Sequence, residues 1–238
     1  VWTELPLTLR TGDERAPAPT AIELRNRTEL ESAVQTMSPE SLREEGVGAR
    51  VGFDVMVDGD GTPRDLVIVE TSCFPAADVR AMEILSRFSF APSTSSALRR
   101  TYAYVWFGPD TVALRLLGDA NPPRQRTSAD SVQIDAAFAA SGGRRPELRN
   151  RGTIARALER LYPPELKRSG LGGETLVWFR IDEEGDVTFR EVNMPSGECE
   201  LDRAALAVGE RMRFRPAVHP DGHEIAVWVA IPIVFSSR

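Results

Sequence analysis

The chain has 238 residues, of which 42% are hydrophobic, and it carries a net charge of −6 with a pI of about 5.2. This hydrophobic content is typical of a globular protein and excludes a disordered chain, and the length suits one large domain or two of ordinary size. The acidic balance argues against nucleic-acid binding, because phosphate contacts need a surplus of Lys and Arg. No apolar run reaches the roughly 20 residues that span a bilayer.

The N-terminal stretch is expected to be a linker. Residues 1–22 contain APAP at 16–19, a composition that favours an extended connection over a packed element. Because the chain begins at Val1 rather than Met, we expect a trimmed or processed product, whose anchor or targeting segment can lie outside the sequence.

The chain then repeats itself at a fixed offset. The pentapeptide ELRNR occurs at 23–27 and again at 147–151, which is 124 positions later. Residues with special backbone or packing roles recur at the same offset, namely the pairs Pro39 and Pro163, Gly46 and Gly170, Asp58 and Asp182, Gly61 and Gly185, Phe90 and Phe214, and Pro92 and Pro216. The alignment needs no gap from position 23 to 108 against 147 to 232. We therefore interpret the chain as a tandem duplication.

Each copy has the same predicted order of elements, most easily followed in the second. A helix over 153–161 ends at the Pro163-Pro164 pair, and a strand follows over 174–182. The turn DEEGD, or DGDGT in the first copy, then leads into a second strand and makes a hairpin. A helix with one apolar face comes next, shared by both copies, with Leu201, Ala205, Val208 and Met212 in one and Ala77, Ala81, Ile84 and Phe88 in the other.

A third strand closes each unit, EIAVWVAIPIVF in the second copy and RTYAYVWF in the first. The predicted fold class is α+β, with two tandem helix–strand–strand–helix–strand units at 23–118 and 147–238. Each unit is expected to have a three-stranded antiparallel sheet with its helices on one face. Residues 119–146 are expected to be a linker that holds a short helix at 131–140. Phe90 and Phe214 are expected to be buried at the junction of helix and third strand.

Two motifs suggest metal binding, and neither fits its usual pattern. VDGDG at 57–61 has Thr62 and Val69 where a calcium loop counted from Asp58 needs ligands, so a hairpin turn is the better interpretation. HPDGH places His219 and His223 four apart, but Pro220 and Gly222 make this a turn rather than a zinc-binding helix. We expect no metal and no cofactor. No nucleophile and base are credibly paired, so we expect no enzymatic activity.

The two cysteines, Cys73 and Cys199, are too few for a disulfide framework. They lie two positions apart when the copies are aligned, in the loop between the second strand and second helix of each copy. We expect free thiols, with a single disulfide as the alternative in an oxidising compartment.

Large aromatic residues are expected on the sheet face opposite the helices. Strand alternation places Tyr102, Tyr104 and Trp106 there in the first copy, and Leu176, Trp178 and Trp228 in the second. Such a face is usually covered. Either the other copy or the linker covers it, or it is a surface for a homodimer or another partner.

The second copy resembles the C-terminal domain of the TonB energy transducers. The matching motifs, in chain order, are Asn150-Arg151, Tyr162–Pro164, Gly170 with Gly172 and Gly173, Asp182 with Gly185, Ser196-Gly197, Leu201–Leu206, Phe214–Ala217 and the final VWVAIPIVF. The first copy resembles the family more weakly, since it has SP for YP, SC for SG and FAPS for FxPA. We interpret it as a diverged domain of the same kind.

The resemblance implies a periplasmic domain that is anchored to the inner membrane in the full-length protein, where an N-terminal anchor would meet motor proteins. It also implies a partner, the TonB box of an outer-membrane TonB-dependent transporter, bound by edge-strand pairing. That function suits the predicted fold, because an edge strand offers unpaired backbone groups. The residues expected to bind are the edge strand Ile225, Ala226, Val227, Trp228, Val229 and Ala230, and the lead-in Leu161, Tyr162 and Pro163. The alternative is a periplasmic scaffold, assembly or sensor domain that uses the same fold for homo- or hetero-association.

Overall fold

A computed structural model describes residues 20–27, 34–94, 96–108, 112–116, 138, 140 and 142–236. Most of the two expected linkers, and nearly all of the helix predicted at 131–140, lie outside these residues. Within the described part of the chain, no helix is both long enough and apolar enough to cross a membrane.

The first half of the chain folds around a hairpin and a third strand, as predicted. A short fourth strand, which was not predicted from the sequence, follows them. In chain order the elements are η1 (Gln35–Met37), α2 (Glu40–Glu45), β1 (Val47–Val57), β2 (Pro63–Glu70), α3 (Pro75–Leu85), β3 (Arg99–Phe107) and β4 (Val112–Leu116). β1 is the central strand and pairs antiparallel with both β2 and β3, while β4 extends the sheet beyond β3.

The second half has the same core order with additional short elements. They are β5 (Glu147–Leu148), α5 (Arg151–Leu161), α6 (Pro164–Ser169), β6 (Gly173–Ile181), β7 (Val187–Met194), α7 (Cys199–Gly209), β8 (Phe214–Arg215), β9 (Ala217–Val218), β10 (Glu224–Ile225) and β11 (Val227–Phe235). Here β6 is central and pairs antiparallel with β7 and β11. The Pro163-Pro164 pair ends α5 as predicted, but Pro164 also begins α6, because proline is tolerated in the first turn of a helix.

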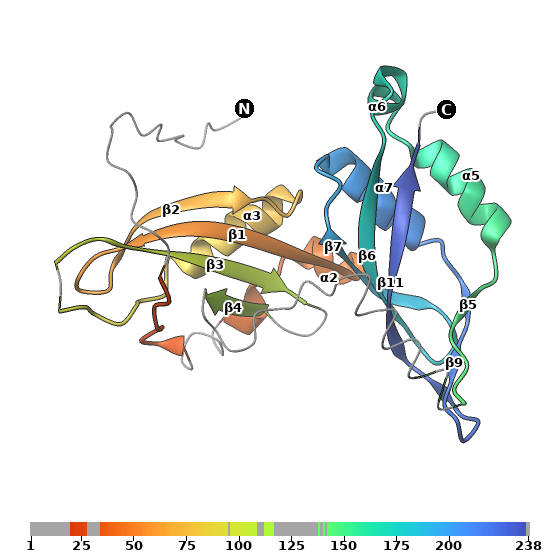
Figure 1. Ribbon diagram of the computed structural model, residues 1–238, viewed down its shortest axis with the longest axis horizontal. Helices are drawn as coiled ribbons and strands as arrows, with labels where there is room; N and C mark the ends of the chain where they lie inside the picture. Colours follow the sequence, from red (N-terminus) through yellow and green to blue (C-terminus); the bar gives the residue numbers. More distant parts are fainter. Residues whose placement is uncertain are drawn as a thin grey trace.

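The expectation of two separate three-stranded sheets is wrong. The strands form one seven-stranded sheet in the order β11-β6-β7-β1-β3-β4, with β2 paired to β1. The halves join through a parallel pairing of β1 with β7, in which Val47 faces Arg190 and Gly48 faces Glu191. Figure 1 shows the first half (orange to green) beside the second (teal to blue), meeting where the α2 end of β1 reaches β7.

The helices pack on the sheet through the faces predicted from the sequence. α3 packs on β1 and β3, while α7 packs on β6, β7 and β11 and is itself contacted by α5. All eight residues of the predicted apolar faces are buried, and they belong to a single hydrophobic core that runs through both halves. Phe90 and Phe214 are also buried, at 0% and 4% exposure, which confirms the prediction for both rings.

The hairpins of the two halves have the same register. Phe53 pairs with Ile68 in one, and Val177 pairs with Val192 in the other, 124 positions later in both strands. The two register shifts also recur at that offset, after Gly52 and Met56 in β1 and after Leu176 and Arg180 in β6. The third strands do not follow the offset of 124. Val51 pairs with Val105, which is 54 positions later, whereas Thr175 pairs with Ile233, which is 58 positions later. The gap-free alignment is therefore wrong beyond the helix, where the second half has four extra residues.

The duplicated pentapeptide has one clear structural role, which belongs to its asparagine. Asn26 donates a hydrogen bond to the Arg87 carbonyl and accepts one from the Ser89 N–H. Asn150 does the same for the Arg211 carbonyl and the Arg213 N–H, at 2.7 and 3.1 Å. Each amide therefore ties the lead-in of its unit to the chain that leaves the second helix.

The hairpin glycines Gly61 and Gly185 are matched in the same way. Both have left-handed φ angles, +92° and +88°. A Cβ on either would lie about 2 Å from the carbonyl oxygen of Phe90 or Phe214, at 1.9 and 2.1 Å respectively. Only glycine permits both the φ angle and this close approach.

The expectation of free cysteines is also wrong, since Cys73 and Cys199 form a disulfide with a Cα–Cα distance of 5.2 Å. The expectation failed because it treated the two loops as belonging to separate sheets. The parallel pairing of β1 with β7 brings the ends of β2 and β7 together, and with them the loops that precede α3 and α7.

Candidate functional site: an open sheet edge

β11 is the terminal strand of the sheet in the second half. This strand pairs with β6 along its whole length, from Val227 opposite Ile181 to Phe235 opposite Gly173. No strand in the described part of the chain pairs with its other side. An edge of this kind carries backbone N–H and C=O groups that can pair with an added strand.

The structure divides the predicted edge residues between two elements. Val227, Trp228, Val229 and Ala230 lie in β11, as predicted. Ile225 lies in β10 and pairs with Ala217 of β9, and Ala226 connects the two strands. The predicted continuous strand is therefore broken, because the HPDGH turn closes a separate hairpin in front of β11.

Of the predicted lead-in residues, Tyr162 is the one whose contacts define a role. Its ring is buried, and its centroid lies 5.3 Å from that of Phe235 at the end of β11. Its hydroxyl donates a 2.8 Å hydrogen bond to the carbonyl of Leu171. Leu161 and Pro163, on either side, are only half-buried. Tyr162 therefore anchors the end of the edge strand to the segment before β6.

The sheet face opposite α7 is covered over part of its area. Trp228 points outward as predicted, with 40% exposure, and its ring meets Phe189 edge-on at 5.7 Å. Leu176 and Trp178, also expected to be outward, are buried at 4% and 8% exposure. Strand alternation placed them on the right face but gave no information on what covers it.

The opposite edge of the second half is closed by the first half. The backbone N–H of Arg190 in β7 donates a 2.9 Å hydrogen bond to the Gly46 carbonyl. Gly48 lies under the ring of Phe189, where a Cβ would come within 2.5 Å of the ring carbon Cζ. These contacts, together with the disulfide, occupy the β7 edge at the junction of the two halves.

Two charged residues of β7 are desolvated at this junction. Burial lowers the pKa of Arg190, against the opposing charges of Glu210 and Glu45, and its Nε has no hydrogen-bond partner among the described residues. Burial also raises the pKa of Glu191 to about 7, although a hydrogen bond with Trp106 and the charge of Arg50 act in the other direction. Glu191 is half-buried as a residue, so the effect comes from the environment of its carboxyl group.

The third strand of the first half is not open in the same way. β4 pairs along β3, from Ala103 opposite Leu116 to Phe107 opposite Val112. The side-chain amide of Gln35 then caps β4, since it donates to the Val112 carbonyl at 2.9 Å and accepts from the Val112 N–H at 3.0 Å. A signal for β4 was present in the sequence, where Arg115 alone interrupts an apolar run over 112–116, but the length of this run is that of a loop segment.

The outer aromatic residues of the first half are covered by arginines and by the second half. The guanidinium of Arg100 binds both carboxylate oxygens of Asp54 and lies 5.3 Å from the Tyr102 ring centroid. Arg50, which forms an ion pair with Glu70, lies 5.5 Å from the ring of Tyr104. Trp106 interacts instead with Glu191 of the second half. The coverage by arginines was not among the expected explanations.

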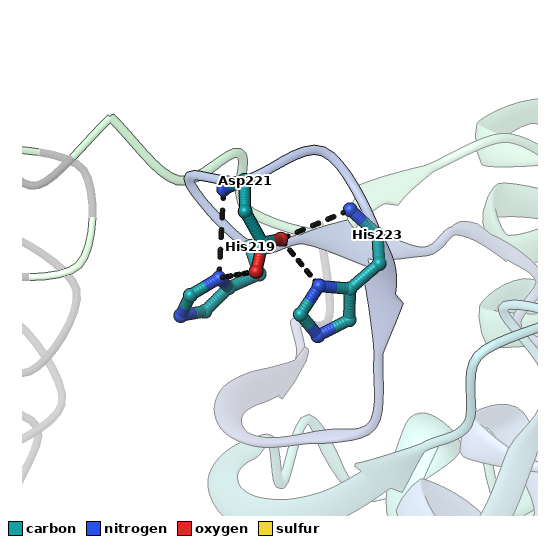
Figure 2. A group of neighbouring side chains, drawn as sticks. All are labelled: His219, Asp221 and His223. Atoms are coloured by element: carbon teal, nitrogen blue, oxygen red, sulfur yellow. Dashed lines mark hydrogen bonds and ion pairs between the residues drawn. The ribbon is translucent and has the colours of Figure 1, made fainter.

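The HPDGH turn brings together the two histidines of the chain (Figure 2). Nδ1 of His219 lies 3.0 Å from Oδ2 of Asp221, and Nδ1 of His223 contacts the other oxygen of the same carboxylate. The rings of His219 and His223 are 4.9 Å apart at an angle of 31°. The histidines are therefore close in space although they do not share a helix face.

The C-terminal third of the chain is similar to known proteins. The family described as Gram-negative bacterial TonB protein C-terminal matches residues 159–237. Protein TonB of Xanthomonas campestris pv. campestris, from strain B100 and from strain ATCC 33913, is 32% identical over 75 residues, which is 32% of this chain and 33% of either relative. The chain thus spans about a third of the length of the curated relatives it matches, and no solved structure matches it. The matched residues begin within α5 and contain β6, β7, α7 and β11 with its open edge, so the similarity to the TonB C-terminal domain family covers the core elements of the second half.

Proposed function

We propose that this chain is a tandem duplication of a TonB C-terminal-like unit, and that its second unit binds an outer-membrane TonB-dependent transporter. In this proposal the TonB box of the transporter adds a strand to β11, and the chain acts without enzymatic activity. The domain works in the periplasm, linked to the inner membrane by a segment outside the sequence. The matching hairpin registers and the matching asparagine bonds support the duplication.

One observation carries the functional proposal, namely the difference between the two third strands. In the first unit, β4 occupies the outer edge of β3, and Gln35 caps β4 in turn. In the second unit, β7 faces the first unit and β11 is left open. Strand addition needs an unpaired edge, so β11 is the favoured position in the unit that the TonB family matches.

The proposal is tested by titrating the full chain with a transporter TonB-box peptide and following backbone amide signals by NMR. Successive residues of a strand point their N–H groups to opposite sides. Of the two variants Trp228→Pro and Val229→Pro, one therefore removes a hydrogen bond to β6 and the other removes a donor at the open edge. The variant that loses only the edge donor should keep its fold and lose binding. Val229→Ala keeps the N–H and should bind as the native chain does.

A second comparison controls for edges in general. β2 also pairs on one side only among the described strands, and its exposed Val67, opposite Asp54, is a regularly paired position on a different edge. Val67→Pro should leave peptide binding unchanged. Peptide-induced shifts confined to β2, β4 or the helices would contradict the assignment to β11.

The alternative is a scaffold in which β11 pairs with another envelope protein or with a second copy of the chain. The covalent and hydrogen-bonded junction of the two units favours this candidate, because it gives the first unit a structural role. The two proposals are distinguished by analytical ultracentrifugation of the native chain and of the proline variant that loses only the edge donor. A dimer that the proline dissociates supports homo-association, whereas a monomer that binds the TonB-box peptide supports the transducer.

A further inference from the structure

We propose that the turn between β9 and β10 binds a divalent transition-metal ion of the Zn²⁺, Ni²⁺ and Cu²⁺ class through His219, Asp221 and His223. The sequence argued against a metal here because proline and glycine exclude a helix. The structure removes that objection, because a hairpin turn brings the two histidines close together without a helix. The proposal is independent of the function proposed for β11.

The backbone of the turn fixes the two histidines opposite each other. The N–H of His219 donates to the His223 carbonyl at 2.8 Å, and the N–H of Gly222 donates to the His219 carbonyl at 2.8 Å. The flanking strands continue the pairing, with Glu224 opposite Val218. His219 and His223 are therefore held where the two strands of the hairpin enter the turn, with Asp221 at its tip.

The side chains converge as ligands would. One possible ligand atom from each of His219, Asp221 and His223 lies within 4.8 Å of the other two. Figure 2 shows both imidazoles turned toward the single carboxylate of Asp221, each through its Nδ1 atom. Ligand atoms around tetrahedral zinc are roughly 3.3 Å apart, given metal–ligand bonds of about 2.0–2.1 Å. All three side chains are exposed, so small rotations suffice to close this difference.

The donor set selects the class of metal. Two imidazole nitrogens and one carboxylate suit zinc, nickel and copper, whereas calcium and magnesium prefer oxygen ligands alone. Three protein ligands leave a fourth position for water or for a ligand from a partner.

The hairpin is also specific to the second unit. The four extra residues identified from the third-strand registers lie between the helix junction and β11, where β9, the turn and β10 are found. This segment holds the two histidines of the chain. Among the described residues of the first unit no hairpin lies between α3 and β3, and the sequence there contains no histidine.

The test is a calorimetric titration of the full chain with ZnCl₂, and separately with NiCl₂, in a buffer that does not bind metals. We expect one ion per chain near neutral pH. His219→Gln and His223→Gln should each weaken binding at least about tenfold. Glu224→Gln removes a neighbouring exposed carboxylate and should bind as the native chain does.

Because these side chains are exposed, the variants should keep the native melting temperature, and a loss of binding will not reflect unfolding. In ¹H–¹⁵N spectra, zinc should shift the signals of residues 217–225 and leave those of the first unit unchanged. Stoichiometric binding that survives in the double variant H219Q/H223Q would overturn the proposal. So would native binding no tighter than that of the double variant, or competition by CaCl₂ at the same concentration as zinc.

Discussion

Removal of the disulfide should lower the free energy of unfolding by up to about 5 kcal/mol. Cys73 and Cys199 are 126 positions apart, so the bond closes a long loop in the unfolded chain. The chain-entropy relation gives about 5 kcal/mol for a loop of this length at 25 °C. The value is an upper bound, because unfolded chains that keep some structure lose less entropy on closure.

The assay is urea unfolding of the native chain and of Cys199→Ser, followed by circular dichroism and tryptophan fluorescence. The core and the sheet are continuous through both units, so the oxidised chain should unfold in one transition. The variant should reach its midpoint at lower urea. Intact mass of the unreduced protein, lighter than the reduced protein by two hydrogen atoms, verifies the bond.

Cys73 offers a matched control for backbone effects. It has a left-handed φ of 65°, and the residue 124 positions later is Gly197, with a φ of 92°. Cys73→Ser and Cys73→Gly both remove the bond, but glycine adopts this φ without steric cost. Cys73→Gly should therefore be more stable than Cys73→Ser by about 1 kcal/mol. A loss below about 1 kcal/mol in Cys199→Ser, or equal stabilities of the two Cys73 variants, would refute this reasoning.

Three further predictions concern the core and the junction. Phe214→Ala should cost about 3–5 kcal/mol in urea unfolding because its ring is 4% exposed, and a cost below about 1 kcal/mol would contradict its burial in a packed core. Asn150→Ala removes two hydrogen bonds to the backbone and should lower the free energy of unfolding by about 1–2 kcal/mol. Asn26→Ala should lower it by a similar amount, and a large difference between the two losses would argue against equivalent roles. Glu191 has a folded-state pKa of about 7, above its ordinary value of 4.5, so the free energy of unfolding should fall as pH rises from about 4.5 to 7, by at most about 3 kcal/mol. Glu191→Gln should remove this dependence, and an unchanged pH profile would exclude Glu191 as its source.

The local structure of each unit could be predicted because local signals agree with one another. The glycine at each hairpin, the helix faces and the buried Phe90 and Phe214 depend on contacts within one unit of about 85 residues. These signals are repeated in both copies, so a weak pattern in one is supported by the other. The offset of 124 accordingly aligns the two hairpins residue for residue.

The junction of the units could not be predicted, because it depends on contacts between residues more than 100 positions apart. Nothing in the composition of VGARVGF at 47–53 shows that its first residues pair in parallel with β7. The disulfide was missed for the same reason, since cysteine spacing says nothing about which loops meet in space. The sequence also gives no measure of how deeply the first unit buries the carboxyl group of Glu191.

The candidate edge was predicted in position but not in extent. Val227 to Ala230 lie in β11, while Ile225 belongs to the hairpin that precedes it. The error arose because EIAVWVAIPIVF is β-rich throughout, and β propensity does not show where one pairing ends and another begins. The strand breaks at Ala226 because Ile225, just before it, pairs with Ala217 of β9. The sequence alone does not identify this partner.

The similarities and differences between the two units have a common pattern. What they share is internal to the unit: the hairpin register, the asparagine bonds and the close approach of the Phe90 and Phe214 carbonyl groups to the hairpin glycines. What differs lies at the edges, where β4 extends the first unit and a histidine-bearing hairpin precedes β11 in the second. An unpaired edge exposes backbone donors and acceptors to unwanted association, so a chain with two such units, each with an open third strand, would double that risk. Closing one copy with its own strand, and using the same copy to cover β7, leaves β11 as the edge of the second unit at which a partner strand can be selected.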